Sequence, residues 1–513
     1  MGNLTSSLGI GLSGLQAAQE AMSVIGHNIA NVNTPSYSQQ TAVLSANQAQ
    51  DYGGVQYGTG VTVTAVQALR NQFLNLQVTQ SLCAQNGSQT LYNGVQAVSS
   101  AFTDNGTNGL NSQMQQFFAS LQTLAGNPSS AALAQNVVGM AQSMISEYQG
   151  AYQTVTSQMD SADQQVSSLV PQINTLTTQI AALNNQISQQ VNPAGDNDAI
   201  DQRQQLTNQL AALVGIQVYA TSDNQYQITL DSGAATLVSG GAAYQMTTAP
   251  NPANNNYQEV SVQSGGMSID VTDKISGGQL GADMTLRDSV LPGYLTQLDD
   301  IAGSLVNQVN KVNMAGFGTD AAGNSVTGTP FFTGAGICSN PLDANYGQVN
   351  TPNNALPASA ANPPDYVGII NSMQVNPLIT ASPTLIGTAA VANTPGDNTN
   401  VLAMAALQTA ADTVDTNDDG AGDSGPFSTV VSSLINNVAT QTQSFNTTFT
   451  NQQNLTTALQ TQQASVSGVD LDEQAAQLLS YQQAYQAAAQ FISTISQLTN
   501  QLMSTVSSAT TTS

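Results

Sequence analysis

Few side chains in this sequence could carry out chemistry, and none stands in a recognisable catalytic pattern. His27 is the single histidine, so a Ser-His-Asp or Cys-His arrangement would have to use it. No Gly-x-Ser-x-Gly motif marks a nucleophilic serine, and Cys83 has no basic neighbour that would lower the pKa of its thiol. His27 follows Ile25 by two residues, on the outer face of a predicted helix. We therefore expect a solvated helix-end histidine and no enzyme.

The segment Gly9 to Gly14 reads GIGLSG and matches the dinucleotide motif G-x-G-x-x-G by its letters. That motif binds a dinucleotide only where it follows a strand and opens a helix. No strand can precede it here, so small residues that allow close helix packing are the better interpretation. Neither Lys274 nor Lys311 follows a glycine, which excludes a phosphate-binding loop.

The segment from Asp415 to Pro426, DTNDDGAGDSGP, is a weak candidate for a calcium site. Asp415, Asn417 and Asp419 have the spacing of the first half of a calcium-binding loop. Pro426 stands at the twelfth position, where such a loop needs a bidentate glutamate. An acidic surface turn is therefore the preferred interpretation, and no metal or other cofactor is predicted.

The two cysteines, Cys83 and Cys338, are far apart in sequence and show no C-x-x-C spacing. This excludes a disulfide framework and a zinc site of the usual spacing. Whether the two cysteines form a single bridge stays open at this stage.

The charge pattern excludes two classes of partner. Charged residues make up 7% of the 513 residues, and the formal net charge is -25. The five basic residues are scattered: Arg70, Arg203, Lys274, Arg287 and Lys311. Nucleic-acid binding needs clustered Lys and Arg, and an anionic membrane surface would repel the chain. No apolar run approaches the roughly 18 residues of a membrane helix. The first residues lack the pattern of a cleaved secretory signal, so we expect a cytoplasmic chain or export without such a signal.

Both ends of the chain carry an apolar seam whose members are spaced alternately three and four residues apart. Near the start the seam is Leu4, Leu8, Gly11, Leu15, Ala18, Met22, Ile25 and Ile29. Near the end it is Leu478, Tyr481, Tyr485, Ala488, Ile492, Ile495, Thr499 and Leu502. Seams of this kind are typical of coiled coils and need partner helices. The two helices could pack on each other in one chain, but their terminal positions favour helices that order mainly on assembly.

The periodicity between these ends changes several times. Strand alternation is expected at Gly60–Val66, and a heptad-like helix is expected after Pro171. The last helix should begin after Gly468, with Asp470 and Glu473 as a capping box. We predict these segments: 1–60, N-terminal assembly helix and hinge; 61–215, mainly helical core; 216–285, β-rich section; 286–315 and 399–467, helical core returns; 316–398, variable outer insertion; 468–513, C-terminal assembly helix.

The predicted fold class is mainly α with β-rich inserted sections. We expect an elongated multidomain protein with its terminal helices paired as a coiled-coil-like domain, a helical bundle in the middle and outer β-containing domains.

Five segments carry a resemblance to a known family. The phrase NIANVNTPSY, from Asn28 to Tyr37, closes the first predicted helix and resembles the N-terminal signature of bacterial flagellar axial proteins. Gly468–Glu473, with the helix after it, resembles their C-terminal signature. Three interior segments are similar to the hook-associated branch of this family, which joins hook to filament: Phe117–Ser130, Ala199–Val218 and Gly277–Asn310. A flagellar hook or rod subunit, or a secreted acidic adhesin, is the alternative.

The resemblance implies a structural role in flagellum assembly and motility. The chain would be exported by the flagellar type III apparatus with a dedicated chaperone and form a ring outside the cell. Its partners there would be copies of itself, the hook protein and the next hook-associated junction protein. The assembly residues would be Leu8, Leu15, Met22, Ile25, Ile29, Asn31, Thr34, Pro35, Tyr37, Leu478, Tyr481, Tyr485, Ile492, Ile495 and Leu502.

Three positions within this resemblance are an arginine pair and one departure from the family pattern. Arg203 and Arg287 match two internal arginines of the family, and each is expected to pair with a carboxylate. Ser36 stands where the family has glycine before the tyrosine, and the sequence offers no reason for the replacement.

Overall fold

The computed structural model of this chain describes residues 2–52, 55–190, 195–221, 223–335, 337–339, 341, 346–349, 368–411, 414 and 425–510. These residues fold into two compact units. The first unit comprises Met1–Gly87, Ser168–Gly281 and Thr450–Ser513, and the second comprises Ser88–Ser167 and Ala282–Phe449.

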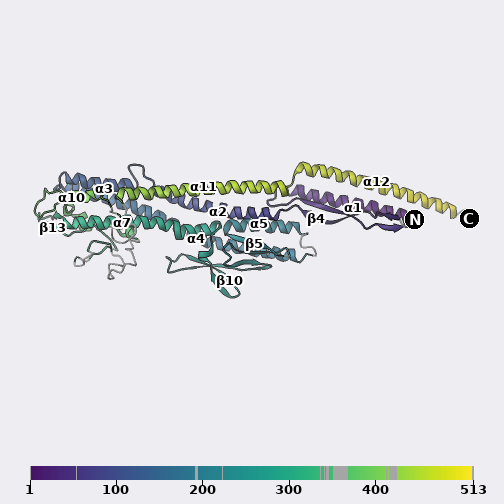
Figure 1. Ribbon diagram of the computed structural model, residues 1–513, viewed down its shortest axis with the longest axis horizontal. Coiled ribbons are helices and arrows are strands. Elements are labelled where there is room, and N and C mark those ends of the chain that lie inside the picture. The colour runs from purple at the N-terminus through teal and green to yellow at the C-terminus, as the bar shows by residue number, and fades with distance from the viewer. Residues whose placement is uncertain are drawn as a thin grey trace. The chain divides into compact units, whose positions relative to one another are not determined.

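Helices dominate both units (Figure 1). They are α1 (Gly2–Ala30), α2 (Gln72–Ser99), α3 (Leu110–Ala125), α4 (Ala131–Ser188), α5 (Asn197–Leu213), α6 (Gly278–Thr285), α7 (Leu291–Ala315), α8 (Ile369–Ser372), α9 (Pro377–Ala381), α10 (Thr399–Ala406), α11 (Phe427–Ser467) and α12 (Leu471–Thr510). A π-helical turn, Leu286–Val290, joins α6 to α7.

The strands are short, and β5 to β11 fall into the predicted β-rich section, whereas the others lie in residues 40–68 and 317–375. They are β1 (Gln40–Ala46), β2 (Gln50–Tyr52), β3 (Val55–Tyr57), β4 (Val61–Ala68), β5 (Ile216–Ala220), β6 (Tyr226–Leu230), β7 (Thr236–Ser239), β8 (Ala242–Ala243), β9 (Met246–Pro250), β10 (Gln258–Ser264), β11 (Met267–Asp270), β12 (Phe317–Thr319), β13 (Ser325–Thr327), β14 (Phe332–Thr333) and β15 (Gln374–Val375). The predicted fold class, mainly α with β-rich sections, is confirmed.

Helix α4 departs from the expectation that a helix begins after Pro171. It runs from Ala131 to Ser188 with Pro171 inside it. A proline within a helix loses one backbone hydrogen bond and clashes with the preceding turn. Val170 and Ile173 beside it are almost fully buried, and their packing offsets that cost.

Asparagine side chains on α4 connect this helix to the two sheets that β5 to β11 form in the first unit. The sheets have the strand orders β5-β6-β7-β8 and β11-β10-β9. Asn184 Nδ2 donates to the Tyr226 carbonyl at 2.8 Å, and its Oδ1 accepts from the Tyr226 amide at 3.0 Å. Asn174 makes the same pair of bonds with Met246, both at 2.8 Å. Each side chain therefore binds one strand residue as a neighbouring strand would.

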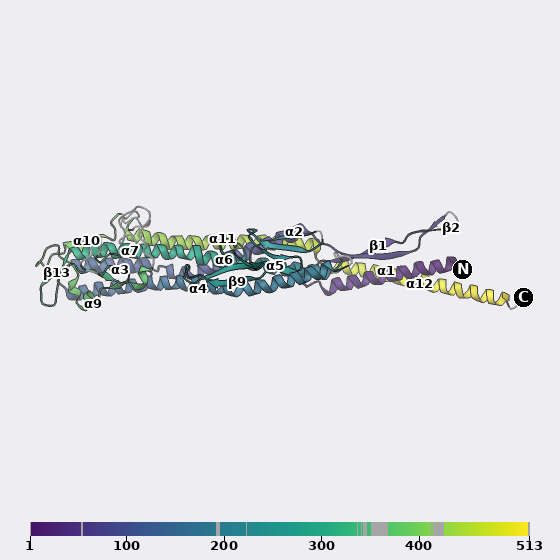
Figure 2. The ribbon, with the colours of Figure 1, turned by 90° about the horizontal axis from the view of Figure 1, so that it is seen from below.

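Strands β1 and β4 form an antiparallel ribbon with an irregularity between Val43 and Leu44. Strand β4 confirms the predicted alternation at Gly60–Val66. The ribbon packs against α1, and its β2 end extends away from that helix (Figure 2). It therefore belongs to the same structure as the N-terminal helix.

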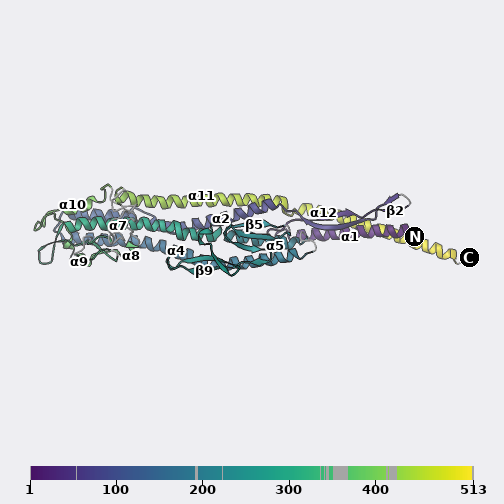
Figure 3. The same ribbon diagram turned by 60° about the horizontal axis from the view of Figure 1, so that its bottom comes forward.

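The core of the second unit is a cluster of phenylalanines. Phe117 lies with its ring centroid 5.8 Å from that of Phe331 and 6.1 Å from that of Phe332. Phe118 packs on Phe427. Helix α10 contacts both α3 and α7, and Figure 3 shows α10 next to α7. Phe331 and Phe332 come from the segment predicted as an outer insertion, so this part of it contributes to a buried core.

Candidate assembly site at the terminal helices

Helices α1 and α12 lie side by side in one chain, as Figures 1 and 2 show. Gly11 is buried between them, and a Cβ placed on it would lie 2.8 Å from Ile492 Cγ1 and 3.0 Å from Phe491 Cδ1. A Cβ on Gly14 would meet Ala488 at 4.0 Å, whereas one on Gly9 would meet nothing within 4 Å. The close-packing interpretation of the glycine motif is therefore confirmed at Gly11.

The seam predicted on α12 faces α1 along most of its length. Its members are half-buried up to Thr499: Leu478, Tyr481, Tyr485, Ala488, Ile492, Ile495 and Thr499. Leu502 is exposed, with 41% of its surface accessible. The helices thus meet within one chain, which is the arrangement that the sequence analysis considered less favoured.

The seam predicted on α1 is less regular. Ile25 is buried, Leu15 and Met22 are half-buried, but Leu8 and Ile29 are exposed at 40% and 37%. An α-helix has 3.6 residues per turn, so a strict seam of alternating threes and fours drifts around it. The buried face consequently includes residues outside the predicted seam: Ala17, Ala21 and Asn28.

Both helices also carry apolar side chains that stay exposed in the described part of the chain. On α12, Phe491 and Leu498 are seven residues apart and share one face, and on α1, Leu8 and Leu12 are one turn apart. We call these four residues the outer apolar stripe. Exposed apolar side chains that line one helix face are candidates for an interaction surface.

The joint between α1, β1 and α12 is built around Asn28, which is 1% exposed. Its Nδ2 donates to the Gln40 carbonyl and to Gln474 Oε1, both at 2.8 Å. Its Oδ1 accepts from the Gln40 amide and from the Tyr37 hydroxyl, both at 2.9 Å. We call these four bonds the Asn28 clamp. One side chain thereby connects the first helix, the first strand and the last helix.

The predicted assembly residues of the hinge have local roles in this joint. The Asn31 carbonyl accepts from the Thr34 amide at 2.9 Å, and the Thr34 carbonyl accepts from the Tyr37 amide at 3.2 Å. Pro35, which is exposed, follows within this turn. Asn31 and Thr34 thus shape the turn that brings Tyr37 back to Asn28.

His27 lies in the last turn of α1 with 42% of its side chain exposed, which agrees with the expected solvated helix-end histidine, but it also has polar partners in the joint. Its Nδ1 lies 3.1 Å from the Tyr37 hydroxyl, and the two rings meet edge to face. Its Nε2 lies 3.5 Å from Asp198 Oδ2. Sequence reasoning missed these partners because they are 10 and 171 residues away along the chain, and the latter comes from α5.

A partly buried ion pair supports the strand that leaves the joint. Arg70 Nε donates to Asp201 Oδ1 at 2.8 Å, and the Ser38 amide donates to Asp201 Oδ2 at 2.8 Å. Burial raises the pKa of Asp201, and the charge of Arg70 opposes that effect. Arg70 is one of five scattered cations in the sequence, where nothing local indicates Asp201 as its partner, so this pair was not predicted.

Ser36 adopts a left-handed backbone, with φ of 63°. Glycine adopts this conformation without steric cost, whereas a residue with a Cβ does not. The glycine preference noted in the sequence therefore has a backbone cause, and Ser36 meets the same requirement with strain.

The start of α12 agrees in part with the predicted capping box. Asp470 Oδ1 accepts from the backbone amides of Asp472 at 2.9 Å and Glu473 at 3.3 Å. The Glu473 carboxylate accepts from Gln477 Nε2 and not from the backbone of Asp470. Asp470 is thus the cap of this helix.

The two internal arginines differ in their partners. Arg287 is buried in the second unit and pairs with Asp163 at 2.6 Å and with Asp288 at 2.6 Å, as predicted. Arg203 is also buried, but it donates to Asn184 Oδ1 at 2.9 Å and to the Asn224 carbonyl at 2.6 Å. Its guanidinium lies 3.8 Å from the centroid of the Tyr226 ring. The expected carboxylate for Arg203 is therefore replaced by neutral oxygens and an aromatic face.

The remaining candidates for chemistry form no site in the described part of the chain. Among described residues, no three His, Cys, Asp or Glu side chains come together as metal ligands. Asp415, Asn417 and Asp419 lie outside the described residues. Cys83 and Cys338 both carry free thiols. No described helix meets the length and hydropathy needed to cross a membrane.

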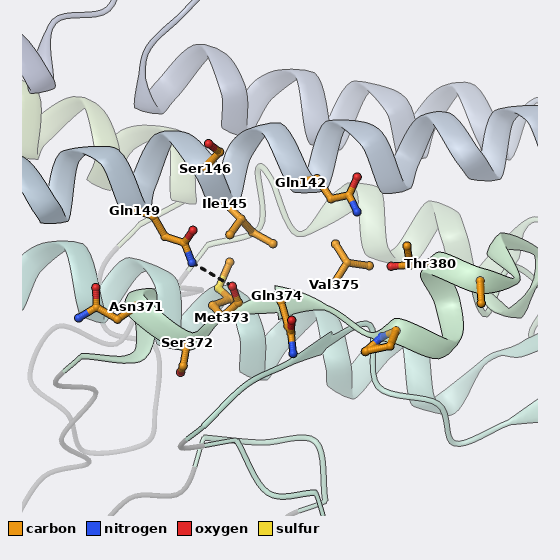
Figure 4. Close-up of a pocket in the computed structure, with 12 residues that line it drawn as sticks. Gln142, Ile145, Ser146, Gln149, Asn371, Ser372, Met373, Gln374, Val375 and Thr380 are labelled. Carbon is orange, nitrogen blue, oxygen red and sulfur yellow. Dashed lines mark hydrogen bonds between the residues drawn. The ribbon is translucent and has the colours of Figure 1, made fainter.

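A groove of about 630 Å³ in the second unit has an uncharged lining. Gln142, Ser146 and Gln149 come from α4, and the opposite wall includes Asn371 and Gln374 (Figure 4). Gln149 Nε2 donates to the Met373 carbonyl at 3.2 Å. The lining contains no acid, base or nucleophile pair that could support catalysis.

Exchanging Gly11 for alanine tests the close approach of α1 and α12. Alanine favours a helix by about 1 kcal/mol over glycine, so Gly9→Ala should stabilise α1. Gly11→Ala gains the same propensity but forces Ile492 aside, at a cost of about 1–3 kcal/mol. Amide exchange across residues 488–495 should therefore accelerate in Gly11→Ala and not in Gly9→Ala. Equal exchange in the two variants would refute the packing.

Replacing Ser36 tests the strain in the hinge. Ser36→Gly should stabilise the joint by about 0.5–1 kcal/mol, because the relief of left-handed strain exceeds the added chain entropy. Ser36→Val should destabilise it by about 1–2 kcal/mol. Urea denaturation of the full chain measures both effects, with Ser36→Ala as the control for the hydroxyl group. A loss of stability in Ser36→Gly would contradict the assignment.

Comparisons with known proteins cover nearly the whole chain. The family model for the flagellar hook-associated protein FlgK helical domain matches residues 95–332. The model for the flagella basal body rod protein matches residues 8–37, and that for the flagellar basal body rod FlgEFG protein C-terminal region matches residues 460–505. The terminal matches thus contain most of α1 with its turn and most of α12.

Curated relatives and a solved structure agree with these matches. Flagellar hook-associated protein 1 of Salmonella typhimurium strain LT2 is 28% identical over 98% of this chain and 100% of its own length. The protein of that name from Escherichia coli K12 is 28% identical over 96% of this chain and 98% of its own.

The structure of the flagellar hook junction protein FlgK from Burkholderia pseudomallei shares the fold, with a TM-score of 0.63 and 17% identity. It covers 76% of this chain and 100% of the solved one. These matches identify the chain as a homologue of flagellar hook-associated protein 1, a structural component of the bacterial flagellum at the hook–filament junction.

Proposed function

We propose that this chain forms a ring on the tip of the flagellar hook, copy against copy through α1 and α12, and that the ring joins hook to filament. Its neighbours along the flagellum would be the hook protein and the next hook-associated junction protein. It would reach this place outside the cell through the flagellar type III export apparatus, held beforehand by a dedicated chaperone.

The observation that carries this proposal is the absence of charge on the terminal helices. The whole chain has a formal net charge of -25, yet α12 contains no charged residue from Gln474 to Thr510. Helix α1 contains Glu20 alone among Asp, Glu, Lys and Arg. Copies of an acidic protein repel one another. Uncharged helices with an outer apolar stripe can meet without that repulsion and remove apolar surface from water.

A second candidate function is that of a rod or hook subunit, because the models that match both termini are described as rod proteins. The interior favours the junction protein, since residues 95–332 match the hook-associated helical domain. A deletion strain distinguishes the two. Loss of a junction protein should leave hooks without filaments, whereas loss of a rod or hook subunit should remove the hook itself.

Placing one charge on the outer apolar stripe tests the assembly role. Leu498 is 50% exposed, so Leu498→Asp should leave the α1–α12 pair intact. Between copies, the carboxylate would be buried without a partner, at a cost of several kcal/mol. The variant, supplied to the deletion strain, should be exported into the medium while hooks stay bare in electron micrographs.

Gln497→Asp is the matched control for this charge. Gln497 is the exposed neighbour of Leu498 and points to the polar side of α12, among Ser493, Asn500 and Gln501. This variant should support filaments. Normal filaments in Leu498→Asp would exclude the outer apolar stripe as the contact between copies.

A further inference from the structure

A chain of polar contacts runs from the surface of the joint to the Asn28 clamp. It starts at Asp198, whose Oδ2 lies 3.5 Å from His27 Nε2. It continues from His27 Nδ1 to the Tyr37 hydroxyl at 3.1 Å and from there to Asn28 Oδ1 at 2.9 Å. The position of each proton along this chain follows from the donors and acceptors at its inner end.

The hydrogen bonds of Asn28 determine to which atom the Tyr37 hydroxyl donates its proton. Because the Gln40 amide donates to Asn28 Oδ1, this atom is an acceptor, and Tyr37 must donate its proton to it. Burial and the nearby charges of Asp198 and Asp201 raise the pKa of Tyr37 to about 12, so the hydroxyl keeps this proton. The Tyr37 oxygen is then free only as an acceptor toward His27.

The contact between His27 and Asp198, at the outer end of this chain of contacts, depends on the protonation of His27. Since Tyr37 can only accept there, Nδ1 of His27 must carry a proton. A neutral imidazole has no second proton, so its Nε2 would present a lone pair to the Asp198 carboxylate. A second proton on Nε2 turns this repulsive contact into a charge-assisted one.

We infer that His27 is a proton-dependent latch on the Asn28 clamp, which tightens the joint of α1, β1 and α12 when its imidazole is protonated. This inference goes beyond the assembly role and does not rest on it. The ionisable groups that face His27 are Tyr37 and, from α5, Asp198 and Asp201. Asp201 is held by Arg70, which leaves Asp198 as the carboxylate that responds.

The way in which the His27–Asp198 contact changes with pH follows from the charges of the two side chains. The contact needs a protonated imidazole together with an ionised Asp198 carboxylate. It should therefore be stronger in mildly acidic than in mildly alkaline solution, and we compare pH 5 with pH 8. The side chains of His27 and Asp198 are 42% and 61% exposed, so screening limits the change in joint opening to about two- to fivefold.

Nuclear magnetic resonance of the full chain tests the proton positions directly. His27 is the single histidine, so ¹⁵N-histidine labelling gives one pair of ring nitrogen signals. At pH 8.5 the neutral ring should carry its proton on Nδ1. A neutral ring protonated on Nε2 would overturn the inference.

A double-mutant cycle with His27→Gln and Asp198→Asn tests the latch itself. Its readout is amide exchange at residues 38–40, corrected for the intrinsic pH dependence of exchange. The two positions should be coupled two- to fivefold at pH 5 and more weakly at pH 8. Equal coupling at both pH values would overturn the inference, whatever the tautomer. Glu20→Gln, which removes a charge from an exposed position of α1, is the control and should leave the coupling unchanged.

Discussion

The side-chain amide of Asn28 is the contact on which the terminal part of this protein depends. Its nitrogen and oxygen together make four hydrogen bonds, two of them to the backbone of Gln40 and the others to Tyr37 and Gln474. A buried amide left without partners would cost about 1–3 kcal/mol. The clamp therefore holds the first helix, the ribbon and the last helix in one arrangement. This arrangement positions the two helices that carry the outer apolar stripe.

Asparagine side chains bind backbone groups at other places in this protein as well. Asn174 and Asn184 each bind both backbone groups of one strand residue, and in the second unit Asn310 binds Phe332 at 2.7 and 2.9 Å in the same way. Neutral amides avoid the large desolvation cost of buried ions. A chain with 7% charged residues can thus fix its geometry through amides. Its carboxylates remain on the surface in large part, where they set the acidic character of the protein.

The local residue pattern predicted the terminal helices and the turn between α1 and β1. The side-chain pairs of the joint could not be predicted, because their members are far apart in the sequence. The alternating seams gave both terminal helices, and the turn phrase after Asn28 marked the hinge. Pairing of His27 with Asp198 joins segments whose contact leaves no local signal. Arg203 shows the second limit, because its partners are a backbone carbonyl and an asparagine that charge counting cannot find. Pro171 shows a third, because packing on both sides outweighed a local helix-breaking preference.

Amide hydrogen exchange along the full-length monomer tests most directly whether the joint holds the terminal helices. Gln474 is fully buried, the seam residues after it are half-buried, and the described residues from Gln501 to Val506 are exposed. Protection should therefore be greatest at residues 38–40 and 474–478 and fall steadily toward residue 510. Uniform protection along α12, or exchange at the joint as fast as at its far end, would contradict the account.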